Sequence, residues 1–568
     1  MRLDEERKQR LGAHSATRRL PAWLGGCLAA LVLAACSQQA SAPAAGAASA
    51  SGTPGEQPAA AVAAATGPSR LVFAAARNVG PLNPHMYSPN QMYGQNLVYE
   101  PLVKFTKEGK VIPWLAESWE IAPDGKSYTF KLRTDVKFSD GSPFDAEAVK
   151  KNVDAVLASR KRHDWLDLMN KLVGAEVVDA HTVRFQLNEA YYPLLQDISL
   201  IRPLRFVAPG SIPESGNTAD GIKAPIGTGP WAVAELKEGE YDLFKQNPHY
   251  WGKKPGFDEV MFKVIPDTNS RALALESGEA DIVFGDGPIT PDAYKRFESQ
   301  KEQFVASASQ PMATRMLALN SKRFPTDDLA VRKAINHAVD KDAIIKNVLF
   351  DIEPKADTLF ATNVPYADIG LKAYAYDPEA AAKLLEEAGW KLPAGGKVRE
   401  KNGKKLAIDL NFVSSDGKER AIAEVLQADL GKAGFQVNLV GEEESAKHAR
   451  EIDGTFHMIF NASWGAPYEP HAFAASMRKP SHADYQAQAG LPMKAEIDKK
   501  ITQVMLEQDE AKRAELWRWI LSTLHEQAVY LPISSLNLIE VHNPKKISHV
   551  EFGALANEIP VELMQPAK

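Results

Sequence analysis

The sequence holds several residue patterns that could support catalysis, and their spacing argues against each one. His525-Glu526 begins like the H-E-x-x-H motif of zinc hydrolases, but Val529 stands where the second histidine ligand would be. There is no G-x-S-x-G turn and no P-loop, and the glycines of 227–229 lack the third member of a dinucleotide fingerprint. The two cysteines, Cys27 and Cys36, are too few for a disulfide framework or a cysteine zinc cluster. We therefore expect a protein that is not an enzyme, with an envelope hydrolase as the alternative from another class.

Two basic residues stand in contexts that could serve ligand binding. Arg202 lies in the apolar stretch 200–204, where a charge is costly unless it is paired. A guanidinium presents a planar fork to a carboxylate, so a carboxylate ligand is one interpretation and an internal ion pair is the other. His482 lies within 480–484, and a neutral imidazole can bind a transition metal. Taken alone, however, His482 would be interpreted as a histidine of a surface loop.

Length and composition indicate a folded protein of more than one domain. The 568 residues are 45% hydrophobic and 24% charged, as is ordinary for globular proteins. No internal apolar run approaches the about 20 residues of a membrane-spanning helix. The formal net charge of −6 argues against a protein that binds nucleic acid through a basic surface.

Residues 1–35 have the composition of a secretory signal peptide. A basic segment with six Lys and Arg precedes an apolar stretch, 21–35, that is too short to span a membrane as a mature helix. The stretch ends in Leu33-Ala34-Ala35-Cys36, which resembles a bacterial lipobox, so we expect cleavage before Cys36 and lipidation of this residue. An ordinary signal peptide that contains a cysteine is the alternative. Because 1–35 also hold three acidic residues, their removal changes the formal net charge from −6 to −9.

The residues that follow are expected to form a flexible tether. Residues 37–66 contain thirteen alanines and no aromatic side chain, and they cannot bury enough apolar surface to offset the entropy of ordering. We therefore interpret 36–68 as a lipidated cysteine followed by a disordered alanine-rich tether. Two acyl chains suffice for stable anchoring, which predicts a periplasmic protein held at a bacterial membrane by Cys36.

From residue 70 on, the sequence alternates between strand and helix patterns. Apolar residues alternate over 406–412 and again over 435–439, and residues 418–433 between them have a helical apolar face, so a parallel βαβ unit is expected. The Asn402-Gly403 pair before this unit predicts a hairpin turn. A helix is expected from Pro378 to Gly389 with Asp377 as its cap, and another over 328–349 with Thr326 or Asp327 as its cap.

Several segments resemble the family of extracytoplasmic solute-binding proteins that serve peptide- and nickel-type ABC transporters. Residues 113–149 are similar to a family-wide stretch, with turns at Asp124-Gly125 and Asp140-Gly141 around an alternating strand and before a helix. Residues 247–281 fit the same family. Longer and more specific segments are similar to the nickel-binding members of the family: 78–92, 160–168, 200–206, 221–231 and 464–488.

The resemblance implies an α/β, two-lobed periplasmic-binding-protein fold of class II, peptide and nickel type. It places the first lobe at 69–311 with an inserted subdomain at about 97–225, the second lobe at 312–531, and a return to the first lobe at 532–568. Residues 315–319 and 529–533 are similar to the two strands at which the chain crosses between lobes. The ligand is expected to lie in the cleft, where hinge closure encloses it.

The resemblance also assigns roles to individual residues. His482 matches the histidine that coordinates the metal, and Arg162 and Arg202 match the arginines that bind the carboxylates of its chelator. His85 and His471 lie in the same segments and are interpreted as structural. The residues that match the pocket wall are Tyr87, Met92, Trp165, Trp464 and Tyr468.

These assignments predict a binding protein that captures nickel(II) as a chelate with a small organic metallophore, for example histidine or a polycarboxylate, and delivers it to an inner-membrane ABC permease. One protein ligand leaves the other coordination positions to the chelator or to water. We expect a monomer that contacts the membrane through its lipid anchor alone and binds no nucleic acid. The alternatives are peptides, opines or haem. Dipeptide-binding relatives carry an aspartate for the ammonium group of the peptide where Pro467 stands here, which argues against free peptides.

Overall fold

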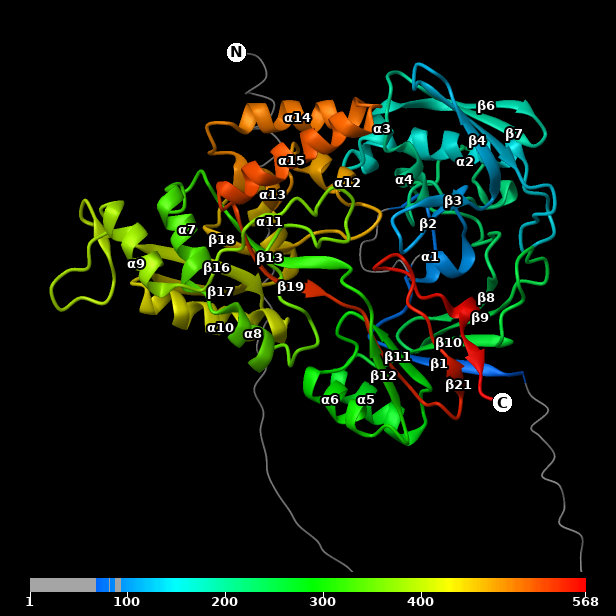
Figure 1. Cartoon of the computed structure of the whole chain (residues 1–568). Helices are drawn as coiled ribbons and strands as arrows, with labels where there is room; N and C mark the ends of the chain where they lie inside the picture. The colour runs from blue at the N-terminus through cyan, green and yellow to red at the C-terminus, as the bar shows by residue number, and fades with distance from the viewer. Residues whose placement is uncertain (1–67, 81, 87–92) are drawn as a thin grey trace, which may run out of the picture. The chain divides into compact units, whose positions relative to one another are not determined.

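The computed structural model describes residues 68–80, 82–86 and 93–568. Gly67–Lys568 form one compact unit, and Figure 1 labels most of its helices and strands. The predicted signal peptide, Cys36, nearly all of the predicted tether, and the predicted pocket residues Tyr87 and Met92 lie outside the described residues.

Within the described ranges, no helix is both long enough and apolar enough to cross a membrane.

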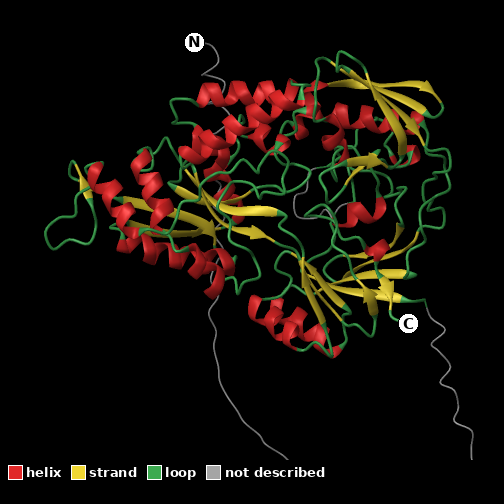
Figure 2. Ribbon diagram, viewed as in Figure 1, coloured by secondary structure: helices red, strands yellow, loops and turns green. Residues whose placement is uncertain are grey.

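Seven strands form the first large sheet, with β1 at its centre. Figure 2 shows the strands of the unit in yellow and the helices that cover them in red. β1 pairs in parallel with β10 and β11, and the other recorded pairings in this sheet are antiparallel. Leu71 and Phe73 contribute to one core, while Ala74 contributes to a second core with α5 (Thr268–Ser277) and α6 (Pro291–Ser299), as alternation along a strand requires. The strands in sheet order are β12 (Val305–Ala308), β20 (Ile539–His542), β11 (Ile282–Gly285), β1 (Arg70–Ala75), β10 (Glu259–Val264), β9 (Tyr241–Gln246) and β8 (Trp231–Lys237).

Five strands form the second large sheet, and it too is covered on both faces. Leu317 and Leu319 of β13 pack with the helices within residues 329–432, whereas Met316 and Ala318 pack with helices within residues 471–526. The strands in sheet order are β17 (Gln436–Glu442), β16 (Ala407–Val413), β18 (Met458–Ala462), β13 (Ala313–Leu319) and β19 (Tyr530–Leu536).

The chain crosses between the two large sheets twice, from β12 to β13 and from β19 to β20. The two crossing segments are hydrogen bonded to each other. The Ser309 N–H donates to the Leu538 carbonyl at 2.8 Å, and the Met312 N–H donates to the Leu536 carbonyl at 2.8 Å. The two large sheets are therefore connected by two short chain segments that are hydrogen bonded to each other.

The expected crossing strands are β13 and β19, which belong to the second sheet and lead into the crossings. The predicted end of the second lobe at residue 531 falls inside β19, which continues in this sheet to Leu536. The boundaries of the lobes and of the inserted subdomain remain predictions.

A third sheet of four antiparallel strands lies within the interval 97–225. The predicted turns at Gly125 and Gly141 have left-handed φ values of 67° and 85°. This sheet and α2 share one continuous hydrophobic core with the helices α12, α14 and α15. Figure 1 shows these three helices along one side of the unit. The elements are β4 (Ala116–Ile121), β5 (Ser127–Leu132), β7 (Thr182–Leu187), β6 (Leu172–Asp179) and α2 (Ala146–Ala158).

The predicted βαβ unit is confirmed, because β16 and β17 pair in parallel on either side of α10 (Gly417–Lys432). The hairpin turn at Asn402-Gly403 is confirmed by φ values of 52° and 73°. The predicted helix with Asp377 as its cap is α9 (Pro378–Glu387).

The single helix expected over 328–349 is wrong. The chain forms α7 (Leu329–Ala338), capped by Asp328, and α8 (Lys341–Asn347), capped by Asp340. Val339 is extended between them, because the Asp340 carboxylate accepts a hydrogen bond from the Ala343 N–H and starts a new helix.

The remaining elements connect or cover the sheets. The helices are α1 (Tyr93–Val98), α3 (Leu168–Lys171), α4 (Leu194–Ser199), α11 (Glu444–Asp453), α12 (His471–Ser476), α13 (Ala483–Gln488), α14 (Lys494–Leu506), α15 (Glu510–Glu526) and the 3-10 turns η1 (Arg160–His163), η2 (Pro209–Ser211) and η3 (Val561–Leu563). The short strands are β2 (Val103–Phe105), β3 (Val111–Pro113), β14 (Glu400–Lys401), β15 (Lys404–Lys405), β21 (Ile547–His549) and β22 (Gln565–Pro566).

Candidate ligand-binding site

Four segments that are distant in the sequence bring five of the predicted site residues together. Trp165 follows η1, and Arg202 follows α4. Trp464 and Tyr468 follow β18, and His482 is the N-cap residue of α13. The segments are contributed by the region around the four-stranded sheet and by the second large sheet, so the cluster depends on tertiary packing.

The chain must turn sharply after β18 to present Trp464 and Tyr468. Gly465 makes this turn with φ of 74°, and a Cβ atom added there would lie 2.5 Å from the carbonyl oxygen of Met312. A side chain at this position would therefore clash with the crossing segment. The Gly465 N–H also donates to the carboxylate of Glu469 at 2.7 Å, which closes the loop on itself.

The aromatic rings form a contiguous wall. The ring centroids of Trp165, Trp464 and Tyr468 lie 6.0 to 6.1 Å from one another. Phe473 packs edge-on against Trp464 at 5.4 Å from behind, in a core position. Offset and edge-to-face contacts at these distances hold the rings in defined orientations. Such a wall can exclude water from a bound molecule.

The Arg202 guanidinium lies over this wall. Its Cζ atom is 5.3 Å from the centroid of Trp165, and the residue is 5% exposed. Arg205, equally buried, has a different role, because its guanidinium donates to the backbone carbonyls of Leu200, Tyr99 and Ser199 at 2.8 to 3.2 Å. Arg205 is thus committed to the fold, whereas the guanidinium of Arg202 is presented beside the aromatic wall.

Arg162 lies in the same neighbourhood but is exposed. Its Nη1 atom is 3.1 Å from the Met86 sulfur. The adjacent His163 is buried, with Nε2 3.0 Å from the His85 carbonyl. Burial lowers the pKa of His163 to about 4, and the charges of Arg202 and Arg162 lower it further against the effect of that hydrogen bond. The charges of Arg202 and Arg162 both lower the pKa of His163, so the two guanidinium groups lie near this histidine.

The His482 imidazole packs against Trp464, with 5.7 Å between the ring centroids. Burial is the main cause that lowers its pKa; the charges of His448 and Lys479 lower it as well, and Glu451 opposes them. Within the described part of the chain, the His482 imidazole makes no side-chain hydrogen bond at the start of α13, and no hydrogen bond contributes to the shift of its pKa. A neutral ring held beside an aromatic wall can donate its nitrogen lone pair to a metal.

Other histidines have structural partners, as expected for His85. The Nδ1 and Nε2 atoms of His85 lie 3.1 Å from the Thr218 hydroxyl and the Arg205 carbonyl. His471 is buried against Tyr192 and Trp517, and burial lowers its pKa to about 3. Both positions agree with the structural interpretation.

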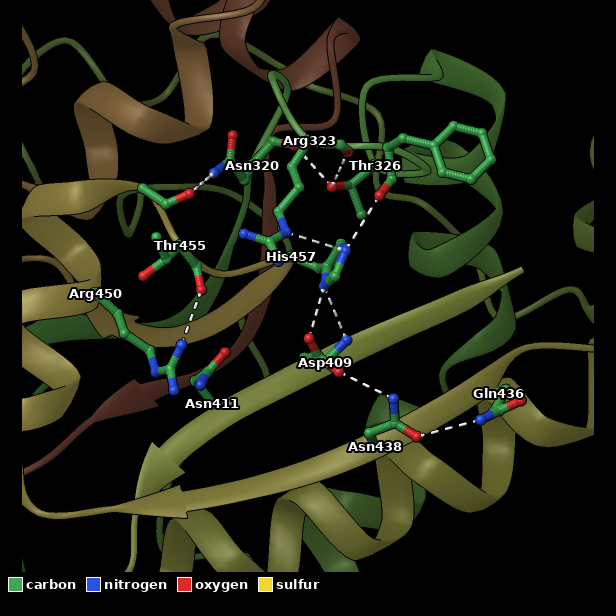
Figure 3. Close-up of polar contacts among 12 residues, drawn as sticks. Asn320, Arg323, Thr326, Asp409, Asn411, Gln436, Asn438, Arg450, Thr455 and His457 are labelled. Carbon is green, nitrogen blue, oxygen red and sulfur yellow. Dashed lines mark hydrogen bonds and ion pairs between the residues drawn. The ribbon is translucent and has the colours of Figure 1, made fainter. Parts of the chain in front are cut away.

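A polar cluster on the second sheet includes a third histidine (Figure 3). The Asp409 N–H donates to His457 Nδ1 at 3.1 Å, and His457 Nε2 lies 3.1 Å from the Phe324 carbonyl. Asn438 donates to the Asp409 carboxylate at 2.9 Å. Because both ring nitrogens of His457 are engaged, this cluster fastens β16, β17 and the start of β18 and offers no lone pair to a ligand.

Across the described ranges, no group of three or more His, Cys, Asp or Glu side chains is arranged to hold a metal ion. A metal at His482 would therefore need most of its ligands from another molecule. Glu469 lies within the segment 464–488 that resembles the nickel-binding relatives, but the sequence alone predicted no role for it. Its signal was a charged residue between Tyr468 and Pro470 in an otherwise apolar loop.

Comparison with known proteins places the chain in a class. Residues 110–485 match the family of bacterial extracellular solute-binding proteins, family 5, middle region. The chain belongs to this family, and the expected two-lobed, mixed α/β fold is confirmed.

Within this family, the chain is similar to nickel-binding proteins. The chain is 50% identical over 505 residues to the nickel-binding periplasmic protein of Escherichia coli (strain K12), covering 89% of this chain and 96% of that protein. The crystal structure of NikA from Brucella suis in complex with Fe(III)-EDTA matches with a TM-score of 0.86 and 56% identity, covering 88% of this chain and 99% of that one. The dipeptide-binding protein of E. coli (strain K12) is 28% identical over 507 residues, covering 84% and 91%.

Proposed function

We propose that this protein is an extracytoplasmic solute-binding lipoprotein that captures nickel(II) as a chelate with a small organic metallophore and delivers it to an inner-membrane ABC permease. The observation that carries the proposal is the convergence of His482, Arg202 and the Trp165–Trp464–Tyr468 wall at one place. The identity to a nickel-binding periplasmic protein and to a protein crystallised with a metal chelate supports it.

Each part of the cluster suits a part of such a chelate. His482 supplies one neutral nitrogen ligand, and the chelator supplies the others. Arg202 and Arg162 pair with its carboxylates, which keep their charge when water is excluded only if a cation faces them. Trp165, Trp464 and Tyr468 shape the wall, and Tyr87 and Met92 are proposed to complete it. Binding and release, with no bond made in the solute, are the expected activity.

The proposal includes the predicted anchor and partners. Lipidation of Cys36 would hold the protein at a periplasmic membrane surface, and the tether would let the compact unit reach the permease as a monomer. Peptides have less support as ligands, because Pro467 occupies the position of the carboxylate that dipeptide-binding relatives use. The relative that is named a dipeptide-binding protein is also less similar.

The direct test is a calorimetric titration of residues 67–568, stripped of metal, with nickel in the presence and absence of free L-histidine. We expect tight binding only with histidine present. In His482→Ala, the affinity should fall at least about tenfold, because the site loses its protein ligand. His448→Ala is the matched control, since His448 lies close enough to act on His482 but is exposed and paired with Glu451 at 3.1 Å. Equal nickel affinity with and without histidine would contradict the proposal.

The pH dependence of chelate binding should follow the lowered pKa of His482. A lowered pKa keeps the imidazole neutral to a more acidic pH than a free histidine side chain. The affinity advantage of the unmodified protein over His482→Ala should therefore stay constant from pH 8 to 6.5. It should shrink by about tenfold per pH unit once the imidazole protonates at lower pH. Titrations of both proteins over pH 5 to 8 measure this difference and cancel the ionisation of the chelator itself. An advantage that begins to shrink above pH 6.5 would contradict the assignment.

A further inference from the structure

A cavity of about 350 Å³ lies beside the two-stranded connection between the sheets. Its size is within the range of pockets that hold small organic molecules. Its walls come from the β2–β3 hairpin, from the crossing after β12 and from loops of both lobes, so a molecule inside it would contact both sides of the hinge. The lining segments are 105–107 and 109, 307–312, 363–365, Ala466, Glu469 and 550–554.

The cavity adjoins the candidate chelate site. The loop after β18 contributes Trp464 and Tyr468 to the aromatic wall and contributes Ala466 and Glu469 to the cavity lining. Ile201, the neighbour of Arg202, packs in one small core with Phe105 and Ala466, both of which line the cavity. The two sites therefore share the loop after β18.

Glu469 is the buried charged group of this cavity. It is 4% exposed, and it accepts a hydrogen bond from the Gly465 N–H at 2.7 Å. Burial raises its pKa to about 7, against the lowering effect of hydrogen bonds from Ser463, Gly465 and Trp464. Among residues 68–80, 82–86 and 93–568, no basic side chain forms an ion pair with Glu469, and no positive charge contributes to the shift of its pKa. Lys107 also lines the cavity but lies at its rim, 4.0 Å from Glu551 and about half exposed.

We infer that this cavity binds a primary ammonium group carried on an apolar carbon chain, with Glu469 as its counter-ion. Much of the remaining wall is apolar, with Phe105, Met312 and Phe552 among its members. A buried carboxylate without a cation is costly, and an ammonium group in the cavity would complete the pair. A carboxylate ligand would meet repulsion at the same place, so the cavity and the arginines of the chelate site select opposite charges.

The test uses three molecules of equal length on the metal-free protein at pH 8: hexylammonium, hexanol and hexanoate. We expect hexylammonium to bind at least about tenfold more tightly than hexanol, and hexanoate to bind most weakly, as measured by ligand-observed NMR and calorimetry. Equal affinities for hexylammonium and hexanol would overturn the inference.

Glu469→Gln should abolish the preference for hexylammonium over hexanol while it keeps an acceptor for the Gly465 N–H. Glu551→Gln is the matched control, because it removes a cavity-lining carboxylate that is already paired with Lys107, and the preference should survive. A second variant, Ala554→Trp, should fill the cavity from another part of its wall. It should weaken the binding of all three molecules while Glu469 is unchanged. A preference that persists in Glu469→Gln would overturn the inference.

Repeating the hexylammonium titration on protein saturated with nickel and L-histidine identifies the source of the ammonium group. Unchanged binding means that a separate amine occupies the cavity, and competition means that the chelate itself brings the group. Both results support the ammonium site. Because the first titration contains no metal, failure of nickel binding leaves this test intact.

Discussion

Replacing Arg202 by glutamine is expected to lower the affinity for the nickel chelate by at least about 30-fold. Removing one partner of a desolvated charge pair costs about 2 to 5 kcal/mol, and each 1.4 kcal/mol is about a factor of ten. Arg202 is buried over Trp165, so solvent cannot replace the lost partner of the chelator's carboxylate. Calorimetry with nickel and L-histidine measures the loss.

Arg205→Met is the comparison variant for this prediction. Arg205 is also an arginine and is as buried as Arg202, but its guanidinium binds backbone carbonyls of the fold. Arg205→Met would leave three buried backbone carbonyls without their donors, so the free energy of unfolding should fall by about 3 kcal/mol. Urea unfolding separates the two variants. If Arg202→Gln destabilises the protein as much as Arg205→Met and leaves chelate affinity unchanged, Arg202 is structural, which is the ion-pair interpretation that its sequence context left open.

Replacing Glu353 by glutamine is expected to lower the free energy of unfolding by about 3 to 5 kcal/mol at pH 7. Glu353 is 3% exposed and pairs with Arg315 at 3.2 Å and Lys418 at 2.8 Å, and it accepts from the Ser534 hydroxyl at 2.5 Å. Arg315 is also buried, so the substitution leaves a charge in the interior without its partner.

The pH dependence gives this prediction a sign. Burial alone would raise the pKa of Glu353, but the charges of Arg315 and Lys418 outweigh it and lower the pKa to about 2. A lowered folded-state pKa stabilises the protein above the ordinary value of 4.5, and this contribution is lost as the pH falls toward 2. The difference between the two proteins in urea unfolding should therefore shrink between pH 5 and pH 3.

Glu386→Gln is the matched control for Glu353. Glu386 also pairs with two cations, Lys391 at 2.7 Å and Arg399 at 2.9 Å, but its carboxylate lies at the surface. Solvent screens such pairs, so the free energy of unfolding should stay nearly unchanged. A loss in Glu386→Gln as large as that in Glu353→Gln would show that burial is not the cause.

The parts of the fold that the sequence predicted are those controlled by local patterns. Alternating apolar residues around a helical face identify the β16–α10–β17 unit, and Asn402-Gly403 has the positive φ values that its turn requires. The helix at 328–349 was predicted as one because its apolar spacing continues past residue 339. α7 ends because Asp340 caps a new helix through one side-chain hydrogen bond to the Ala343 N–H. The spacing of apolar residues contains no information about this hydrogen bond.

The candidate site was reached from the resemblance rather than from local pattern. No property of residues 160–168 indicates that Trp165 lies beside Trp464, because this contact depends on how the region of the four-stranded sheet packs against the second large sheet and its helices. The same limit applies to Glu469. Its burial and its place in a cavity wall are tertiary properties, and in the sequence it is one acid between Tyr468 and Pro470.

The hydrogen bonds between the two crossings limit how the lobes can move. Two independent linkers would permit twisting, sliding and bending, whereas segments fastened at Ser309–Leu538 and Met312–Leu536 behave mechanically as one ribbon. Such a two-stranded ribbon bends easily out of its own plane. It resists sliding of one strand along the other, because sliding would break both hydrogen bonds. Opening should therefore follow a single soft degree of freedom, like a door on one hinge. Progress toward the closed state could then be reported by one well-placed distance, such as a spin-label pair across the cleft, whatever solute is bound.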